Sequence, residues 1–240
     1  MVLLSETVPL RYGEITREEL ISGIAKWAKV TVSDGERTEV LTGGADSRYF
    51  PPYVFTTSKI VGEPGKTYTL RAEYKDYVAT ATTTIPKPVE PDEVYCRALG
   101  DTTYTVVVRF TDPPEKGNYY RAFTKTIGKD GRYQPSMAAY ASDEVFDGSA
   151  EMILFSTQRL LEPLYMLDFK QGDEVWVKFC TMDKATFNFW SNYEVMLATN
   201  ANGSWWFDTD MEVNVHGALG YWAGYGVSER KVVIGEQVNP

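Results

Sequence analysis

The sequence predicts an all-β protein, on the strength of its composition and of its local patterns. Aromatic residues make up 14% of the 240 residues, with 16 tyrosines, and threonine and valine are frequent. Residues of these types favour strands. Short alternating segments recur between turn signals, and patterns typical of long helices are few. We therefore expect two β-domains, residues 1–88 and residues 89–240, with one helix near residues 183–198 in the second.

The first domain is expected to open with a strand over residues 2–5, followed by a short helix. Thr16 and Glu19 have the spacing of a capping box, in which each side chain accepts a hydrogen bond from the other residue's backbone N–H. The apolar residues after them predict an amphipathic helix that covers a sheet edge: Leu20, Ile21, Ile24 and Trp27.

Two strands and a loop are predicted next. Residues 28–32 alternate, and Asp34 with Gly35 turns the chain back into a strand over residues 38–41. Residues 43–57 are expected to be a loop, because two adjacent prolines within them prevent central strand pairing.

The strongest hairpin of the first domain joins residues 67–74 to residues 77–85. A glycine-proline turn precedes it, and threonines alternate with alanines in its second strand. Three prolines interleaved with charged residues follow at 86–92. This composition predicts an exposed linker between the two domains.

Strand-like segments dominate the second domain as well. In the first of them, Tyr104, Val106, Val108 and Phe110 share one face. After a turn rich in proline, the second segment is expected to return beside the first. The predicted strands cover residues 103–110, 118–127, 152–156 and 175–180.

One helix is predicted in this domain, starting after Asp183, which has a residue type that caps helices. Its apolar residues recur at spacings of three and four. We expect this stripe to pack on the sheet, and a ligand-binding aromatic face is the alternative. The stripe consists of Thr186, Phe189, Trp190, Tyr193, Met196 and Leu197.

A glycine-rich stretch at residues 212–234 is predicted to be a long, bent strand that closes the β-domain. Leu219, Tyr221, Ala223, Tyr225 and Val227 would share one face, with Trp222 on the other among glycines. The glycines do not have the spacing of a dinucleotide-binding fingerprint, and no helix pattern follows them. No phosphate site is expected.

The net charge of −9 is spread along the chain. It argues against nucleic acid and against anionic membrane surfaces as partners, since both need basic patches. No apolar run reaches the length of a membrane-spanning helix, and residues 1–4 are too short for the core of a signal peptide. Because the chain opens inside a strand-like segment, we expect that an upstream portion is missing.

Cys96 and Cys180 are the two cysteines, and both lie in strand-like segments. They permit one disulfide but have no zinc-site spacing, so we expect buried free thiols. The single histidine, His216, is the base that any serine or cysteine hydrolase would need. It lies on a predicted strand with no nucleophile elbow in the sequence, so a structural role is expected.

Carboxylates offer two weak candidates for a metal site. Asp208, Asp210 and Glu212 alternate and would project from one strand face, where three carboxylates can hold calcium. The second group is Asp143, Glu144 and Asp147, around Gly148. A solvated acidic face is the simpler interpretation of either group, because neither has the pattern of an EF-hand loop.

Adjacent aromatic residues at Trp205, Trp206 and Phe207 are the candidate contact site for a ligand or partner. Neighbouring residues of a strand point to opposite faces, so at most one of the two tryptophans enters the core readily. Sugar rings stack on such side chains, and tryptophan is enriched at binding hot spots. Packing beneath the predicted helix is the alternative.

Several of these stretches together resemble one family, the Gram-negative envelope lipoproteins described as domain of unknown function 4249. The most specific piece runs from Asn214 to Tyr225 and is similar to a family pattern of asparagine, glycines and an aromatic pair. The other pieces are residues 28–35, 65–86, 112–113 with 118–120, 142–148, 172–173 and the helix after Asp183.

The resemblance covers nearly the whole chain and implies an architecture and a location. Family members begin with a lipoprotein signal, an acylated cysteine and a further strand, which this chain lacks, so an outer-membrane lipoprotein is expected only in the full-length form. Residues 65–86 are also similar to the immunoglobulin-like and carboxypeptidase-regulatory-like domains found beside carboxypeptidases and outer-membrane receptors. We therefore expect an immunoglobulin-like sandwich at residues 1–88 and a larger β-sandwich after it.

The resemblance implies no active site, because the family has no established activity. The expected function is a non-enzymatic module of the cell envelope that binds an outer-membrane receptor or a ligand such as a glycan. Two alternatives remain: a hydrolase of glycans or peptides that uses paired carboxylates, and a structural spacer. No cofactor is expected.

Overall fold

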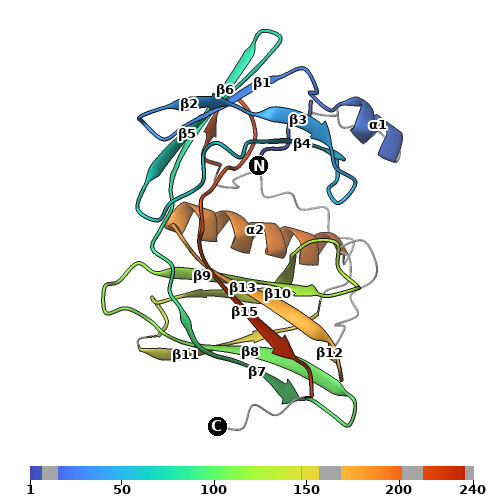
Figure 1. Ribbon diagram of the computed structural model, residues 1–240, viewed down its shortest axis with the longest axis vertical. Helices are drawn as coiled ribbons and strands as arrows, with labels where there is room; N and C mark the ends of the chain where they lie inside the picture. Colours follow the sequence, from blue (N-terminus) through green and yellow to red (C-terminus); the bar gives the residue numbers. More distant parts are fainter. Residues whose placement is uncertain (7–15, 147, 157–168, 202–212, 236–240) are drawn as a thin grey trace. The chain divides into compact units, whose positions relative to one another are not determined.

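The computed structural model describes residues 1–6, 16–146, 148–156, 169–201 and 213–235 (Figure 1). Antiparallel strands dominate these residues, which confirms the predicted all-β class. The chain divides into two compact units. The first contains Met1–Thr84 and Val213–Ala223, and the second contains Ile85–Glu212 and Gly224–Pro240. The sequence pattern gives no sign that residues 213–223 return to the first unit, and the immunoglobulin-like character of that unit stays a prediction.

A five-stranded sheet in the order β14-β6-β5-β1-β2 forms the first unit. The predicted hairpin is present, since β5 and β6 pair along their full length. Tyr68, Leu70 and Ala72 alternate along β5 and are buried, so this face of the strand lines the core. The strands are β1 (Lys29–Ser33), β2 (Thr38–Val40), β5 (Thr67–Tyr74), β6 (Tyr77–Thr84) and β14 (Val215–His216).

Helix α1 (Arg17–Ser22) starts with the predicted capping box. The Thr16 hydroxyl accepts from the Glu19 N–H, and the Glu19 carboxylate accepts from the Thr16 N–H. The helix ends at Gly23, earlier than the apolar spacing predicts. Trp27 is therefore not part of it and is 90% exposed, instead of covering a sheet edge.

The segment predicted to be a loop contains two paired strands, β3 (Thr42–Ala45) and β4 (Tyr53–Thr56). The two prolines lie before β4, so they do not interrupt the ladder. The Tyr53 side chain lies over Gly43, where a Cβ would be 2.6 Å from its hydroxyl oxygen. The expected strand over residues 2–5 is reduced to isolated bridges, Val2 with Phe55 and Ser5 with Ile24.

Two sheets form the sandwich of the second unit (Figure 1). One has the order β10-β9-β13-β15, and the other contains β11, β8 and β12, with β7 also paired to β8. Their inner faces share one core, which includes Phe110, Tyr120 and Phe179. The strands are β7 (Pro91–Ala98), β8 (Thr103–Thr111), β9 (Tyr119–Thr126), β10 (Gln134–Ser142), β11 (Ser149–Leu154), β12 (Phe169–Lys170), β13 (Glu174–Met182) and β15 (Gly226–Val233).

Strand β9 does not return beside β8, contrary to the prediction. It pairs with β10 and β13 in the opposite sheet. Pro113 and Pro114 between the two strands have no N–H for a ladder, so the chain leaves the first sheet and crosses to the second. Strand β8 is instead paired with β7 and β11, and its centre is buried on both faces, with Val106 and Val107 each 0% exposed.

The segment predicted to be an exposed linker is bound into the second unit. Strand β7 already begins at Pro91, which is buried. The Thr181 hydroxyl donates to the carbonyl of Lys87 at 2.7 Å, and the Ser228 hydroxyl donates to the carbonyl of Val89 at 3.1 Å. These bonds fix the segment to β13 and β15.

Helix α2 (Lys184–Ala201) lies along the outer face of the sheet that contains β9 and β10 (Figure 1). Asp183 caps it as predicted, because its carboxylate accepts from the Thr186 N–H at 2.7 Å. Thr186 of the predicted stripe is fully buried, and Phe187 beside it packs against Tyr119 and Tyr140. None of the helices in the described ranges is both long and apolar enough to cross a membrane.

The glycine-rich stretch is not one long strand, contrary to the prediction. Strand β14 pairs with β6, β15 pairs with β13, and residues 217–225 between them form no strand. Gly217 has φ of +84°, in the region that favours glycine. The Asn214 side chain closes the loop by donating to the Trp222 carbonyl at 2.5 Å and accepting from the Trp222 N–H at 2.8 Å. Leu219 is 83% exposed, so the predicted apolar face does not exist.

Candidate functional site

The outer face of one sheet of the second unit carries polar side chains from β7, β8 and β11. In the register of these strands, Arg109 of β8 lies opposite both Glu93 of β7 and Glu151 of β11. Successive side chains of a strand point to opposite faces, so these three point away from the core side chain of Val108. The pairing of three strands thus places one arginine between two carboxylates.

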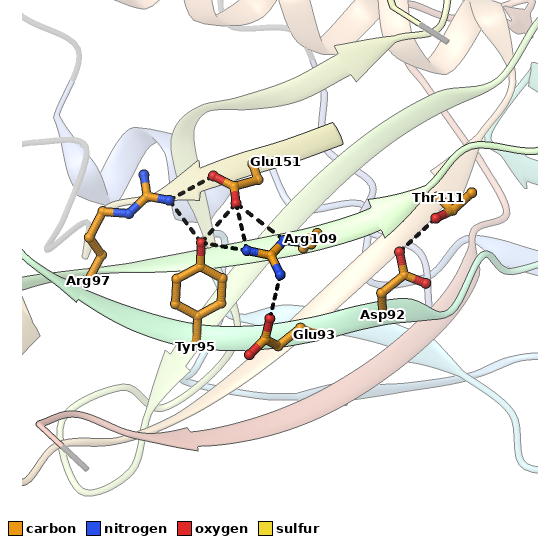
Figure 2. A network of polar contacts seen from close by, with 7 residues as sticks. All are labelled: Asp92, Glu93, Tyr95, Arg97, Arg109, Thr111 and Glu151. Carbon is orange, nitrogen blue, oxygen red and sulfur yellow. Dashed lines mark hydrogen bonds and ion pairs between the residues drawn. The ribbon is translucent and has the colours of Figure 1, made fainter. Parts of the chain in front are cut away.

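Glu151 is the centre of a hydrogen-bonded network on this face (Figure 2). Its carboxylate accepts from the Tyr95 hydroxyl at 2.8 Å, from Arg97 Nη2 at 2.7 Å and from Arg109 Nη2 at 3.1 Å. Arg97 Nη2 also donates to the Tyr95 hydroxyl oxygen at 2.8 Å, and Arg109 Nη1 donates to Glu93 at 2.9 Å. The two guanidinium groups lie 5.7 and 5.4 Å from the centre of the Tyr95 ring. We refer to these five residues as the Tyr95 network.

The network holds Glu151 as an anion. Hydrogen bonds from Arg97, Tyr95 and Arg109 lower the pKa of Glu151 to about 2. The hydrogen bond to Glu151 raises the pKa of each arginine in return. A general acid needs a carboxyl pKa that is raised towards neutrality. Glu151 is therefore not suited to act as a general acid near neutral pH.

The network is ordered and still reachable from solvent. Its four charged side chains have exposed fractions between 35% and 43%. Val107 of β8 lies opposite Tyr95 of β7 in the register and is fully buried. The polar side chains of the network are therefore packed beside a buried apolar residue. Tyrosine and arginine are enriched at binding hot spots, and groups that are already ordered lose little freedom when a partner binds. The arrangement suits recognition more than catalysis.

A second charged pair lies on the other sheet, under α2. Arg121 of β9 is 1% exposed, and its Nη2 donates to Glu194 of α2 at 2.6 Å. The guanidinium lies 4.4 Å from the ring centre of Trp190, whose Nε1 donates to the Tyr225 hydroxyl at 2.7 Å. Trp190 of the predicted stripe is thus part of the helix–sheet contact. Of the other stripe residues, Phe189 stacks on Tyr193, and the side chains of Met196 and Leu197 lie outside the described residues.

Most sequence-predicted site residues lie where the structure gives no description. This holds for the aromatic candidates Trp205, Trp206 and Phe207 and for the metal candidates Asp208, Asp210 and Glu212. Contact with a ligand, a partner or a metal at residues 205–212 therefore stays a prediction.

The remaining candidates are separated in the structure. His216 is exposed on β14, opposite Thr80. Asp143 is buried, whereas Glu144 is exposed. The Glu144 carboxylate accepts from the Tyr119 hydroxyl at 3.1 Å and from Lys184 Nζ at 3.2 Å. Asp147 lies outside the described residues. Within the described ranges, no three or more histidine, cysteine, aspartate or glutamate side chains gather as a metal site. Cys96 and Cys180 form no disulfide, as predicted; Cys180 is buried, whereas Cys96 is half-buried.

The residues of the Tyr95 network are absent from the sequence-predicted sites. One signal of them is local: Glu93, Tyr95 and Arg97 alternate along β7. The decisive signal is not local, because Arg109 and Glu151 are 42 residues apart in the chain. Only the pairing of β8 with β11 brings them together.

Two comparisons with known proteins bear on the family of the chain. No curated protein matches the chain. The family model described as a domain of unknown function (DUF4249) matches residues 1–231. The chain therefore belongs to the DUF4249 family.

Proposed function

We propose that the protein is a non-enzymatic binding module of the cell envelope, which holds an outer-membrane receptor through the outer face of β7, β8 and β11. The observation that carries this proposal is the Tyr95 network, a preformed and partly exposed group of tyrosine and arginine side chains. The sequence resemblance to envelope lipoproteins supports the location.

The charges of the network favour a protein as the partner. Positive and negative groups alternate across the three strands, with Arg109 bonded to Glu93 on one side and to Glu151 on the other. A partner must therefore present acceptors and donors in a matching order over several strand spacings. Folded protein surfaces supply such complementary patterns, which set specificity and orientation more than raw affinity.

Binding by variants of the purified protein tests this proposal. Crosslinking in envelope extract identifies partners, and each partner is then purified and titrated with the wild-type chain. Arg97→Ala removes one donor of the network and leaves Arg109 to hold Glu151. We expect this change to weaken binding at least about tenfold, the loss typical of a hot-spot arginine. Arg230→Ala is the matched control, because Arg230 is an exposed arginine bonded to Glu90 outside the network.

The outcomes separate the alternatives. Equal loss of affinity in both variants, or none in Arg97→Ala, would overturn the assignment of this face. A panel of glycan and peptide substrates is run beside the titrations. Turnover that disappears when a single acidic residue is changed would replace the binding module with a hydrolase. Failure to bind any envelope component, without turnover, would leave a structural spacer.

A further inference from the structure

Two connections at one edge of the sandwich in the second unit are bound to each other. One is residues 112–118, between β8 and β9, and the other joins β10 to β11, with residues 143–146 and 148 described. The Asp112 N–H donates to the Gly148 carbonyl at 2.9 Å, and the Asp143 N–H donates to the Asn118 carbonyl at 3.1 Å. We refer to the two connections together as the double loop.

Two buried carboxylates of the double loop each have one oxygen without a hydrogen-bond partner among the described residues. Asp112 is 4% exposed and Asp143 is 2% exposed. One oxygen of Asp112 accepts from the Tyr120 hydroxyl at 2.5 Å, and one oxygen of Asp143 accepts from the N–H groups of Gly117 and Asn118 at 2.8 and 2.9 Å. The other two oxygens, Asp112 Oδ2 and Asp143 Oδ1, are buried and accept from no donor in the part of the chain that the structure describes.

The two carboxylates occupy one region around Tyr120. The Phe146 ring of the double loop packs against the rings of Phe110 and Tyr120, 5.9 and 6.3 Å away between centres. The Tyr120 hydroxyl donates to Asp112, and the N–H of Asn118, two residues before Tyr120, donates to Asp143. Asp112 is thus held by the side chain of Tyr120, and Asp143 is held by the backbone just before that residue.

A buried carboxylate oxygen without a donor is strongly unfavourable, and a bound cation or a water molecule that donates to it removes this cost. The double loop already attracts positive charge, since Lys116 Nζ donates to the carbonyls of Asp143 and Phe146 at 3.3 and 3.4 Å. One ammonium group cannot balance two carboxylates. A divalent cation would satisfy both unpartnered oxygens and would draw further oxygen ligands from carbonyls and water.

We propose that the double loop binds a divalent cation, with Asp112 Oδ2 and Asp143 Oδ1 as its carboxylate ligands. Calcium fits this site best, because it accepts six to eight oxygen ligands in irregular geometry, backbone carbonyls included, whereas magnesium requires a near-ideal octahedron. Two carboxylates are fewer than the ligand groups of tight calcium sites, so we expect a Kd of about 10⁻⁴ M. This site is independent of the Tyr95 network and of the proposed function.

Calcium titration of the chelator-treated protein tests the proposal. The wild-type chain should bind calcium with a stoichiometry of one, and about 10 mM calcium should raise its thermal midpoint by several degrees. Terbium should occupy the same site and luminesce when the nearby tyrosine is excited. Asp112→Asn and Asp143→Asn keep an acceptor for the existing hydrogen bonds but remove the charge, and each should weaken calcium at least tenfold. Glu144→Gln removes one charge from the adjacent exposed position and should bind like the wild type.

The site can also be located without variants, in case both asparagine variants fail to fold. Calcium should shift the amide resonances of Gly117 and Asn118 in the wild-type protein, because these amides donate to Asp143. Absence of saturable binding up to 10 mM calcium would overturn the proposal. Wild-type affinity in a folded Asp112→Asn or Asp143→Asn variant, or shifts confined to other amides, would overturn it as well.

Discussion

Replacing Gly217 with alanine should destabilise the first unit. Gly217 follows β14 with φ of +84°, a conformation that costs an L-residue about 1–2 kcal/mol. A Cβ there would also collide with the carbonyl oxygen of Val78 in β6, a backbone atom that moves only with its strand. Overpacking of this kind costs about 1–3 kcal/mol. We therefore expect a loss of about 2–5 kcal/mol in the free energy of unfolding.

Gly220→Ala is the matched control for this change. Gly220 lies in the same loop, and a Cβ there would meet only the Val215 side chain, at an ordinary 3.4 Å. Its effect should stay within about 0.5 kcal/mol. Urea unfolding followed by circular dichroism gives both values, with the first unit expected to unfold earlier in the glycine 217 variant. Equal stability of the two variants would refute the reasoning that the β14–β6 contact requires glycine at this position.

Three further predictions concern charge and thiol chemistry. Glu151 should titrate at about pH 2 in carboxyl NMR. The stability that its ionised form contributes is therefore fully present above the ordinary glutamate pKa and is lost as the pH falls towards 2. Glu194→Gln should destabilise the second unit by roughly 3 kcal/mol in urea unfolding, because it leaves the buried Arg121 guanidinium without its carboxylate. Cys180 should resist iodoacetamide in the native protein, since burial raises its thiol pKa to about 12, whereas the half-buried Cys96 should react first by mass spectrometry.

Each of these has an outcome that would contradict it. A Glu151 midpoint near the ordinary glutamate value of 4.5 would mean that the arginines do not bind its carboxylate in solution. Glu229→Gln is the control for Glu194→Gln, because the partner of Glu229, Lys178, is 3.5 Å away and is more exposed than Arg121. The control should lose less than about 1 kcal/mol of stability. An equal loss in both variants would contradict the argument. Alkylation of Cys180 as fast as Cys96, or a disulfide between them, would contradict the third prediction.

Features set by residues that are close in the chain were predictable from the sequence. The capping box at Thr16 depends on a residue three positions later, and the Asp183 cap depends on the Thr186 N–H in the same way. The β5–β6 hairpin needs only a short turn between two alternating segments. In these cases the local pattern already contains both partners of the interaction.

Features that depend on distant partners were not predictable. Nothing near residues 118–127 indicates that β9 joins the sheet opposite β8. The sheet that β9 joins depends on which strand has an unpaired edge where the chain arrives after Pro113 and Pro114. The glycine-rich stretch has the alternation of one strand, yet Gly217 and the side chain of Asn214 turn it into a loop between two strands of different sheets. The Tyr95 network needs three strands in register before its charges meet.

The late return of β14 to β6 has a consequence for how the protein is made. Val215 pairs with Ala81, roughly 130 residues earlier, so at about 5–20 residues per second the ribosome needs on the order of ten seconds between the two. During that interval β14 is not yet paired with β6, and other chains can pair with an exposed strand edge of this kind. A premature stop before residue 213 would therefore yield an N-terminal unit with an unsealed edge. Translation speed over the second unit thus controls how long the first remains vulnerable to aggregation.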